Sequence, residues 1–344
     1  MAQIDKPNLN FNTVLYTGNA STRSITGVGF QPDWCWFKSR GDTNGHMLYD
    51  VVRGATKVVL SNSGNAEATE TNGLTSFDSD GFSIGSAGGE NASGQPIVAW
   101  NWKAGGSGSA NTNGTINSTV SANATAGFSV VKYTGTGSNA TVGHGLSSAP
   151  LAVFVKNYSN GSNYDWICYH KNAGNSGFLR LNTANAYDTS INAFNSTDPT
   201  STVFSIGSHT AINGSSDNFI AYCFAEKKGY SQFGSYTGNA STNGPFIYTG
   251  FKPAWVLQKN YTNGSSNDWT LADNKRPGYN EINKRLVPNT NAAEATNNQI
   301  DFLSNGFKIR GSETNANGSG QTYVYLAFAE NPIVGSNNVA AVAE

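Results

Sequence analysis

The same short motifs occur three times along this chain, in the same order. Tyr-Thr-Gly begins at Tyr16, Tyr133 and Tyr236. A proline-led apolar segment follows, with a lysine six residues after each proline: Pro32 and Lys38, Pro150 and Lys156, Pro253 and Lys259. A Phe-x-Ile segment comes next, and a closing apolar segment is introduced by Asn91, Asn213 or Asn317. Motifs that repeat in a fixed order indicate three copies of one small structural unit.

The repeat divides the chain into five segments. They are the first repeat at residues 1–104, a linker rich in Gly, Ser and Asn at 105–126, the second repeat at 127–228, the third repeat at 229–331 and a C-terminal tail at 332–344. A polar, low-complexity linker is typical of a flexible hinge. We therefore expect the second and third repeats to pack as a unit and the first to be hinged. The tail is either loose or an arm for a neighbouring subunit.

The closing segments alternate in side-chain size. In the first repeat Val98, Trp100 and Trp102 share one face of the predicted strand, and a period of two is typical of a half-buried strand. Asp80-Gly81 and Asn305-Gly306 predict tight hairpins. We expect roughly six to eight short strands in each copy, with the first and last strands as neighbours. The pattern predicts an all-β fold of three tandem antiparallel β-sandwich domains, of the jelly-roll or concanavalin-like type.

The charge of the chain excludes several kinds of partner. Charged residues make up only 12% of the 344 residues, and the formal net charge is −1. A near-neutral surface has neither the basic footprint of a nucleic-acid-binding protein nor a polybasic membrane patch. The N-terminal segment has no apolar stretch typical of a secretion signal, and no run approaches the ~20 apolar residues of a membrane span. We expect no nucleic-acid partner and no membrane insertion.

The three cysteines align with mostly apolar residues in the other copies. Cys35 aligns with Val153 and Val256, Cys168 with Leu271, and Cys223 with Asn101 and Ala327. Small packed side chains explain this pattern better than nucleophiles do. The odd count and the absence of a Cys-x-x-Cys pair also argue against a disulfide framework or a zinc site.

Histidines and carboxylates form no recurring constellation. His46, His144, His170 and His209 do not recur at equivalent positions, so we interpret them as surface or turn residues. Residues 78–81 resemble the opening of a calcium loop but lack its other ligands, which favours a hairpin turn. The one acidic match between copies is Asp165 with Asp268, and it is more consistent with a turn cap than with a glycosidase carboxylate. We predict no catalytic residue, no metal and no cofactor, and hence no enzyme.

Five segments of the first repeat carry a resemblance to a known family. They are residues 16–19, 25–34, 52–57, 76–82 and 98–104. They resemble an uncharacterised β-sandwich repeat domain found in tail-fibre-like and other structural proteins of bacteriophages, notably marine cyanophages. The resemblance spans roughly residues 11–104 and is weaker over the later copies, which lack the Val-Arg-Gly-Ala-Thr-Lys segment of residues 52–57. It implies a place in a virion and synthesis in the bacterial cytoplasm, and it implies no established activity.

Two near-identical loops are the candidate binding elements. Residues 157–164 and 260–267 set tyrosine among Asn, Ser and Gly, which is the composition of adaptable binding loops. The candidate ligand-binding residues are Tyr158, Tyr164 and Tyr261, whose rings and hydroxyls suit sugars. Two alternatives stay open, namely a contact to another virion subunit and packing of the loop over its own sandwich.

Three functions are compatible with these patterns. The first is a non-enzymatic virion structural protein, tail-fibre-like or at a tail tip, exposed on the particle surface with loops that bind a host-surface glycan. The second is a head-decoration or cement protein that binds the capsid lattice. The third is a polysaccharide depolymerase, which the scarcity of carboxylates disfavours. The expected partners are other virion subunits and a host glycan, and analogy with virion appendages predicts a homotrimer.

Overall fold

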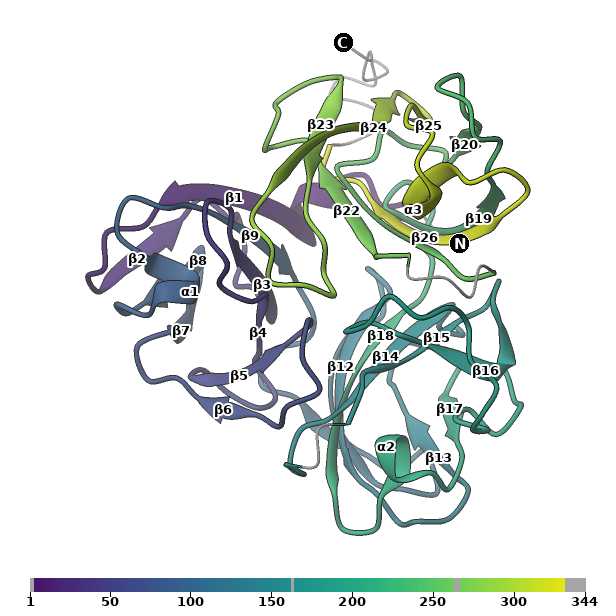
Figure 1. Ribbon diagram of the computed structural model, residues 1–344. Helices are drawn as coiled ribbons and strands as arrows, with labels where there is room; N and C mark the ends of the chain where they lie inside the picture. The colour runs from purple at the N-terminus through teal and green to yellow at the C-terminus, as the bar shows by residue number, and fades with distance from the viewer. Residues whose placement is uncertain (1–2, 162–163, 263–266, 332–344) are drawn as a thin grey trace.

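The computed structural model describes residues 3–161, 164–262 and 267–331. Within these residues the chain is all-β, with several antiparallel sheets and only short helical turns. Figure 1 shows three lobes around a common centre, one for each repeat: the first on the left, the second below and the third at the upper right. Each lobe contains two sheets.

The first repeat begins with the short 3-10 helix η1 (Pro7–Leu9) and continues into two sheets. The larger sheet contains, in order, β1 (Phe11–Thr17), β9 (Pro96–Trp102), β3 (Trp34–Ser39), β4 (Met47–Asp50), β5 (Lys57–Leu60) and β6 (Ala68–Thr69). The smaller sheet contains β2 (Arg23–Thr26), β8 (Gly81–Ile84) and β7 (Leu74–Asp78). One helical turn, α1 (Gly88–Asn91), joins β8 to β9.

The second repeat has the largest sheet. Its strands, in order, are β10 (Ser109–Asn111), β11 (Ser118–Asn123), β12 (Phe128–Thr134), β18 (Asn218–Phe224), β14 (Ala152–Asn157), β15 (Ile167–His170) and β16 (Gly174–Arg180). The smaller sheet pairs β13 (Ala140–Gly143) with β17 (Val203–Ile206). The helical turn α2 (Thr210–Asn213) precedes β18.

The third repeat has two four-stranded sheets. The first contains β19 (Ser231–Thr237), β26 (Thr322–Phe328), β21 (Trp255–Asn260) and β22 (Thr270–Asp273). The second contains β20 (Phe246–Tyr248), β25 (Gly306–Ile309), β24 (Ala295–Leu303) and β23 (Ile282–Arg285). The helical turn α3 (Thr314–Asn317) precedes β26.

Strand pairing confirms two expectations from the sequence. The first and closing strands of each repeat are neighbours, as β1 with β9, β12 with β18, and β19 with β26. The two predicted hairpins are also present, because Asp78 pairs with Gly81 and Leu303 pairs with Gly306. The proline-led strand pairs with the other edge of the closing strand in every repeat.

The closing strand of the first repeat is buried on both faces, which corrects the expectation of a half-buried strand. Every residue of β9 from Ile97 to Trp102 is buried. Trp100 and Trp102 belong to a core that all three repeats share, whereas Ala99 belongs to the first repeat's own core. The large side chains therefore pack between repeats, and the small ones face the repeat's own second sheet.

The shared core is aromatic at each boundary between repeats. Each boundary has a close ring pair: Trp34 with Tyr222 at 4.5 Å between centroids, Trp102 with Trp255 at 5.4 Å, and Phe224 with Phe328 at 6.0 Å. Such pairs contribute about 1 kcal/mol each beyond the area that they bury. The first repeat is thus packed against both others, and the prediction that it is hinged is wrong.

The predicted linker at 105–126 is largely ordered. Its strands β10 and β11 extend the larger sheet of the second repeat, with Val120 opposite Val131. Ile116 and Val120 are buried in the second repeat's own core. These two apolar side chains, set among Ser, Thr and Asn, give the segment a buried face. The prediction of a flexible linker is therefore wrong for these two strands.

The repeated tyrosine and asparagine hold together the loops at the end of each repeat. In the second repeat, the Tyr133 hydroxyl donates to Ile212 O at 2.7 Å. The Asn213 amide donates to Ser138 O and Gly207 O, and its oxygen accepts from Thr136 N. Tyr16 and Asn91 make the equivalent bonds in the first repeat, each to its own partners, and Tyr236 and Asn317 make them in the third. Each buried amide is satisfied by three different segments, which explains its recurrence.

The glycine of the Tyr-Thr-Gly motif is required by a close approach. A Cβ on Gly135 would lie 2.2 Å from Gly214 O, and one on Gly18 would lie 2.0 Å from Ala92 O. No real Cβ tolerates such a contact with backbone.

Equivalent contacts close the three repeats into a ring. The Trp166 indole of the second repeat donates to Leu60 O of the first at 2.8 Å, and the Trp269 indole of the third donates to Arg180 O of the second at 2.7 Å. His46 occupies the same position in the first repeat and faces the backbone of Val287 in the third. A further set of matched bonds joins Glu67 N to Tyr158 O, Tyr187 N to Tyr261 O, and Glu294 N to Arg40 O. Head-to-tail contacts that return to their start define a ring with pseudo-threefold symmetry.

Candidate binding face

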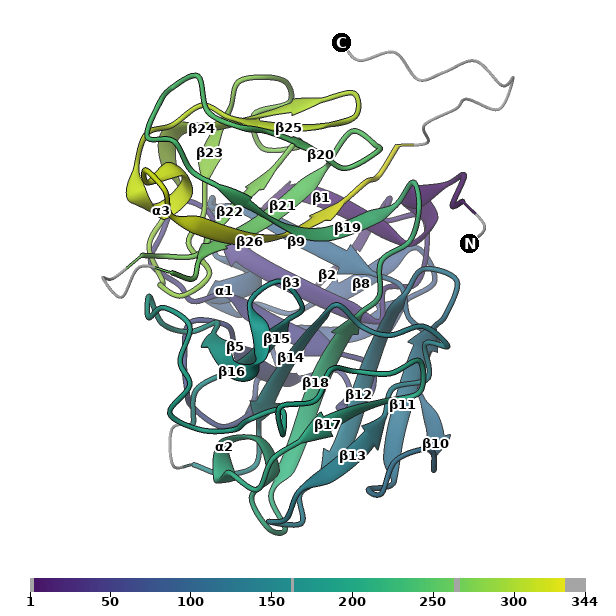
Figure 2. The same cartoon turned by 90° about the vertical axis from the view of Figure 1, so that its right-hand side faces the viewer.

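One end of the ring carries the loops of all three repeats. In the first repeat β1 ends here, because Thr17 pairs with Pro96, and β3 ends here, because Ser39 pairs with Ile97. Because a pseudo-threefold axis relates the repeats, equivalent elements of the three repeats lie at the same position along that axis. Figure 2 accordingly shows α1, α2 and α3 in its left half, while β26 runs out toward the right. We call this end, with its helical turns and the loops that surround them, the loop face.

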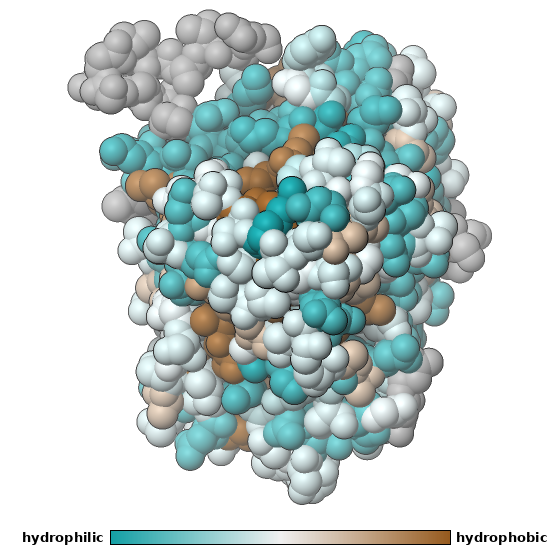
Figure 3. All heavy atoms as spheres, turned by 90° about the vertical axis from the view of Figure 1, so that its left-hand side faces the viewer, coloured by the Kyte–Doolittle hydropathy of each residue, from teal (hydrophilic) through white to brown (hydrophobic). Residues whose placement is uncertain are grey.

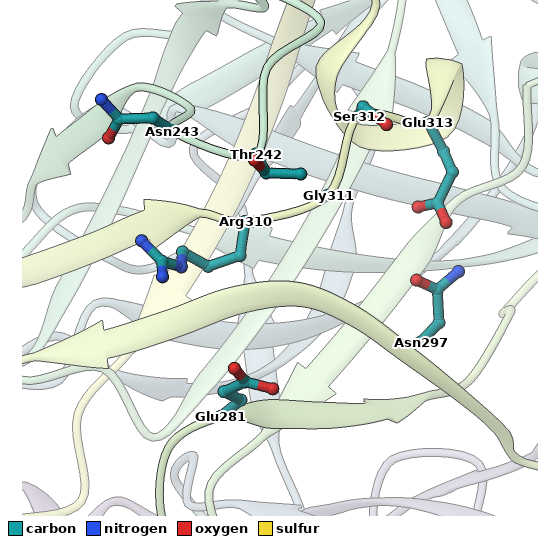
Figure 4. A pocket seen from close by; sticks show the side chains of 8 residues that line it. All are labelled: Thr242, Asn243, Glu281, Asn297, Arg310, Gly311, Ser312 and Glu313. Carbon is teal, nitrogen blue, oxygen red and sulfur yellow. The ribbon is translucent and has the colours of Figure 1, made fainter.

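A hollow lies beside each helical turn. The α1 hollow has a volume of about 330 Å³ and the α2 hollow about 560 Å³. The α3 hollow has about 520 Å³ and is lined by Thr242, Asn243, Glu281, Asn297, Arg310, Gly311, Ser312 and Glu313. Figure 4 shows its lining residues, which come from the loop before β20, the residue before β23, β24 and the segment after β25. All three hollows border a helical turn, the α1 hollow on the side of β4 and β5 and the other two on the side of the loop that follows the first strand of the repeat.

The linings of the hollows differ in chemistry. The α3 hollow carries charges of both signs, and Arg310 Nε forms an ion pair with Asp301 at 3.3 Å. The α2 hollow is lined by Asn139, Ile191, Asn192, Ser208, His209 and Thr210. The α1 hollow is more apolar, with Met47, Val58 and Leu60 among its lining residues. A common framework thus presents three chemically distinct recesses.

Glu90 is the exceptional residue of the α1 hollow. The residue is 1% exposed, and its Oε1 accepts a hydrogen bond from the Tyr49 hydroxyl at 2.6 Å. Among the residues that the structure describes, Oε2 has no hydrogen-bond partner. Burial raises the pKa of Glu90 to about 7, although the bond from Tyr49 opposes the rise. Sequence reasoning missed this residue, yet the repeat contains the signal, because Glu90 directly precedes the repeated Asn91.

The predicted binding tyrosines lie apart from these hollows. Tyr158 and Tyr261 are partly buried and pack against the shared core, one at each of two boundaries between repeats. Tyr164 packs against the second repeat's own core. The Tyr261 hydroxyl donates to Asn172 O at 3.2 Å in the second repeat. These contacts favour the packing alternative. Residues 162–163 and 263–266 of the two loops fall outside the described residues.

The repeated lysines anchor the bases of these loops. Lys156 Nζ donates to Tyr164 O at 2.5 Å and to Gly64 O of the first repeat at 2.6 Å. Lys259 Nζ donates to Asn267 O and to Ala184 O of the second repeat. Burial lowers the pKa of Lys156 to about 8 and that of Lys259 to about 7. Each of these lysines therefore fastens a loop to the neighbouring repeat.

Two acidic matches between repeats were missed in the sequence. Arg53 Nε pairs with Asp50 at 2.6 Å, and Arg276 Nε pairs with Asp273 at 2.6 Å. The Nη1 atom of each arginine reaches a second carboxylate, Glu67 in the first repeat and Glu294 in the third. Asp165 and Asp268 are thus not the only acidic match. The sequence signal for this match is an Asp three residues before an Arg. Arg276 is the counterpart of Arg53, so the third repeat retains the arginine of the segment at residues 52–57, although it was expected to lack that segment.

These networks also cross the boundaries between repeats. The Tyr222 hydroxyl of the second repeat donates to Asp50 Oδ2 at 2.9 Å, and the Trp100 indole of the first donates to Asp273 Oδ2 at 3.0 Å. At the third boundary the equivalent residue is His170, whose Nε2 lies 3.2 Å from Tyr325 O. These contacts therefore join the repeats to one another.

The remaining candidates are structural. The three cysteines are free and buried, as expected from their apolar matches. His46, His144 and His170 are buried, which corrects their interpretation as surface or turn residues. Burial lowers the pKa of His170 to about 4 and outweighs its bond to Tyr325. Asp80 accepts from Gly27 N and Gly29 N beside its hairpin, which supports the hairpin-turn interpretation.

The described residues show neither a metal-binding cluster nor a membrane-spanning helix. They hold no group of three or more His, Cys, Asp or Glu arranged to bind a metal ion. No helix formed by them is long and apolar enough to cross a membrane. Figure 3 views the molecule from the side of the first repeat, where apolar residues form small separate spots on a largely polar surface.

The geometry defines a class of protein, an all-β ring of three related units with recesses at one end. A family model described as a domain of unknown function (DUF7483) matches residues 6–332, and the chain belongs to that family. This single match runs through all three repeats, in agreement with their shared core. No curated protein and no solved structure matches the chain.

Proposed function

We propose that this chain is a non-enzymatic bacteriophage virion structural protein, a tail-fibre-like or tip component that binds host-surface glycans through its loop face. Its three repeats would be tandem antiparallel β-sandwich domains of the jelly-roll or concanavalin-like type. The observation that carries the proposal is the loop face, which places three related but chemically different recesses at one end of a single body. Three recesses on one body would add avidity toward a repeating glycan.

Two measurements test this proposal. A reconstruction of the purified particle should contain density for the chain on its exterior, and purified protein should bind host cells in competition with their surface polysaccharide. Arg310→Ala, in the α3 hollow, should weaken that binding. Lys103→Ala, at the opposite end of β9, is the matched control and should leave it unchanged. Absence of the chain from particles would overturn the proposal.

A head-decoration protein is the second candidate. The pseudo-threefold ring favours it, because such a body matches the local threefold sites of a capsid lattice. Density on the head rather than the tail would select it over the first candidate. Release of reducing ends from host polysaccharide would instead support a depolymerase.

The homotrimer predicted from the sequence stays part of the proposal. The three repeats, however, already give one chain of 36.3 kDa a pseudo-threefold arrangement without a homotrimer. Sedimentation equilibrium distinguishes a monomer from a homotrimer, since a homotrimer has three times the mass of the chain.

A further inference from the structure

The α1 hollow contains a carboxylate that the fold does not need. Counted from the repeated asparagine, Glu90 corresponds to Ile212 in the second repeat and Ala316 in the third. Ile212 lies in the second repeat's own core, and Ala316 is fully buried in the third repeat. An apolar residue therefore serves this position in two of three repeats. A carboxylate here costs stability, because one of its oxygens is buried without a partner.

The backbone around Glu90 leaves room for a ligand. Gly88 and Gly89 stand where the second repeat has Thr210 and Ala211. The nearest atom to a Cβ on Gly88 would be Asn44 Nδ2 at 3.7 Å, so space remains beside this residue. A Cβ on Gly89 would lie 2.4 Å from Met47 Cε, so glycine allows Met47 to form the wall of the hollow. The recess thus depends on two glycines peculiar to the first repeat.

The lining specifies the charge of an occupant. Two carboxylates line the hollow, Glu70 and Glu90, and no Lys, Arg or His is among its lining residues. Met47, Val58 and Leu60 add apolar walls. A buried carboxylate that lacks a cationic neighbour is best satisfied by a charge-assisted N–H donor. An apolar wall then favours a donor carried on a hydrocarbon body.

We propose that the α1 hollow binds a small organic ammonium ligand, with its N–H donor on Oε2 of Glu90 and its apolar body against Met47, Val58 and Leu60. The site belongs to the first repeat alone, because the equivalents of Glu90 in the other repeats are apolar. It does not depend on the virion assignment.

Binding should strengthen as the pH rises through about 7, because the ligand requires the ionised form of Glu90. Two other side chains act on this carboxylate: Tyr49 donates to it from β4, and Glu70 raises its pKa through like charge. A hydrogen bond from the backbone of Glu90 itself lowers the pKa, and Tyr16 donates to the backbone carbonyl of Glu90. Burial raises the pKa of both tyrosines above their ordinary value. Glu90 is therefore the group that titrates near neutrality.

The test uses cyclohexylamine as the probe and cyclohexanol as its neutral counterpart, with binding followed by NMR titration of the full chain at pH 8. Saturable binding of cyclohexylamine is expected, with shifts centred on α1 and β4 and little binding of cyclohexanol. Glu90→Gln should weaken cyclohexylamine binding by about tenfold or more, since a charge-assisted bond is lost. Glu281→Gln, a matched change in the α3 hollow, should leave it unchanged.

A second variant keeps the proposal falsifiable if Glu90→Gln alters the hollow. Gly88→Leu fills the recess while leaving Glu90 in place, and it should abolish binding in a chain whose folding is verified by its spectrum. Equal binding of cyclohexanol, equal binding by Glu90→Gln, persistence of binding in Gly88→Leu or absence of saturable binding would each overturn the proposal.

Discussion

Buried charge is distributed unevenly over equivalent positions of the three repeats. Asp50 and Asp273 each meet an arginine three residues later, whereas the second repeat has His170 and Ala173 at these places. The boundary between the second and third repeats therefore lacks this buried Asp-Arg pair. A buried pair contributes little net stability, but removing one partner leaves an unpaired buried charge.

Arg53→Ala should lower the free energy of unfolding by about 3–5 kcal/mol, because it leaves Asp50 buried without its ion-pair partner. Chemical denaturation measures the change. The control is Arg180→Ala, whose ion pairs with Asp165 and Asp188 are partly exposed and should contribute about 1 kcal/mol or less. Equal effects of the two substitutions would contradict this account. Combining Arg53→Ala with Asp50→His, the second repeat's arrangement, should recover part of the loss.

Glu90 should make the protein less stable as the pH rises. Its pKa is about 7 in the folded chain against an ordinary value of 4.5, so the folded state holds a proton that the unfolded state releases. Stability is therefore full below about pH 4.5, falls as the pH rises to about 7, and is lower by about 3 kcal/mol above that. Glu90→Gln keeps the shape and should remove this dependence. Thermal unfolding of both proteins between pH 5 and 8 measures it, and parallel curves would refute it.

Individual residues were predictable from the sequence where the repeat supplied an internal comparison. The apolar matches of the cysteines correctly placed these side chains in cores. The same comparison distinguishes Glu90 from Ile212 and Ala316, whereas the Asp-Arg pairs are hard to recognise because the residues around them diverge. Burial of the histidines was not predictable from spacing, since it arises where separate repeats meet.

At the scale of elements, each helical turn is held by one asparagine. Asn213→Ala should cost at least about 2 kcal/mol, because it leaves Ser138 O, Gly207 O and Thr136 N without their partner. Denaturant unfolding gives the value. Asn185→Ala, at an exposed loop position, should stay within about 0.5 kcal/mol. A tolerated Asn213→Ala would mean that water replaces these bonds.

The tyrosine loops can be tested for packing against ligand recognition. Tyr158→Ala should lower the free energy of unfolding by about 1–3 kcal/mol, since the ring packs against the shared core. Tyr158→Phe keeps the ring and should be nearly neutral. Loss of host-cell binding at unchanged stability, in Tyr158→Ala, would restore the ligand-binding interpretation.

Strands and hairpins were predictable because local chemistry determines them. Asp-Gly and Asn-Gly fixed two turns, and the alternating segments became the closing strands. The strands β10 and β11 were not foreseen, because only Ile116 and Val120 reveal a buried face in an otherwise polar stretch. The composition of this segment is that of a polar linker, but its two buried apolar residues are enough to hold it against the second repeat.

The whole molecule should unfold as one unit. The shared core and the matched boundary contacts couple every repeat to both others. Calorimetry should therefore give a single transition whose calorimetric and van't Hoff enthalpies agree. An early, separate transition assigned to the first repeat by hydrogen exchange would instead indicate a hinge. This level of organisation was not readable from the sequence, since alternation shows which face is buried but not what covers it.

Closure of the ring within one chain has a consequence for how its recesses can diverge. In an assembly of three identical chains, any substitution appears three times, so a costly change such as a buried carboxylate is imposed at every site. Here one repeat carries Glu90 while the other two keep Ile212 and Ala316. Covalent continuity also holds the three units at a fixed effective concentration, so dilution cannot separate them. Three repeats in one chain allow one recess to change its chemistry while the other two preserve the stability of the whole.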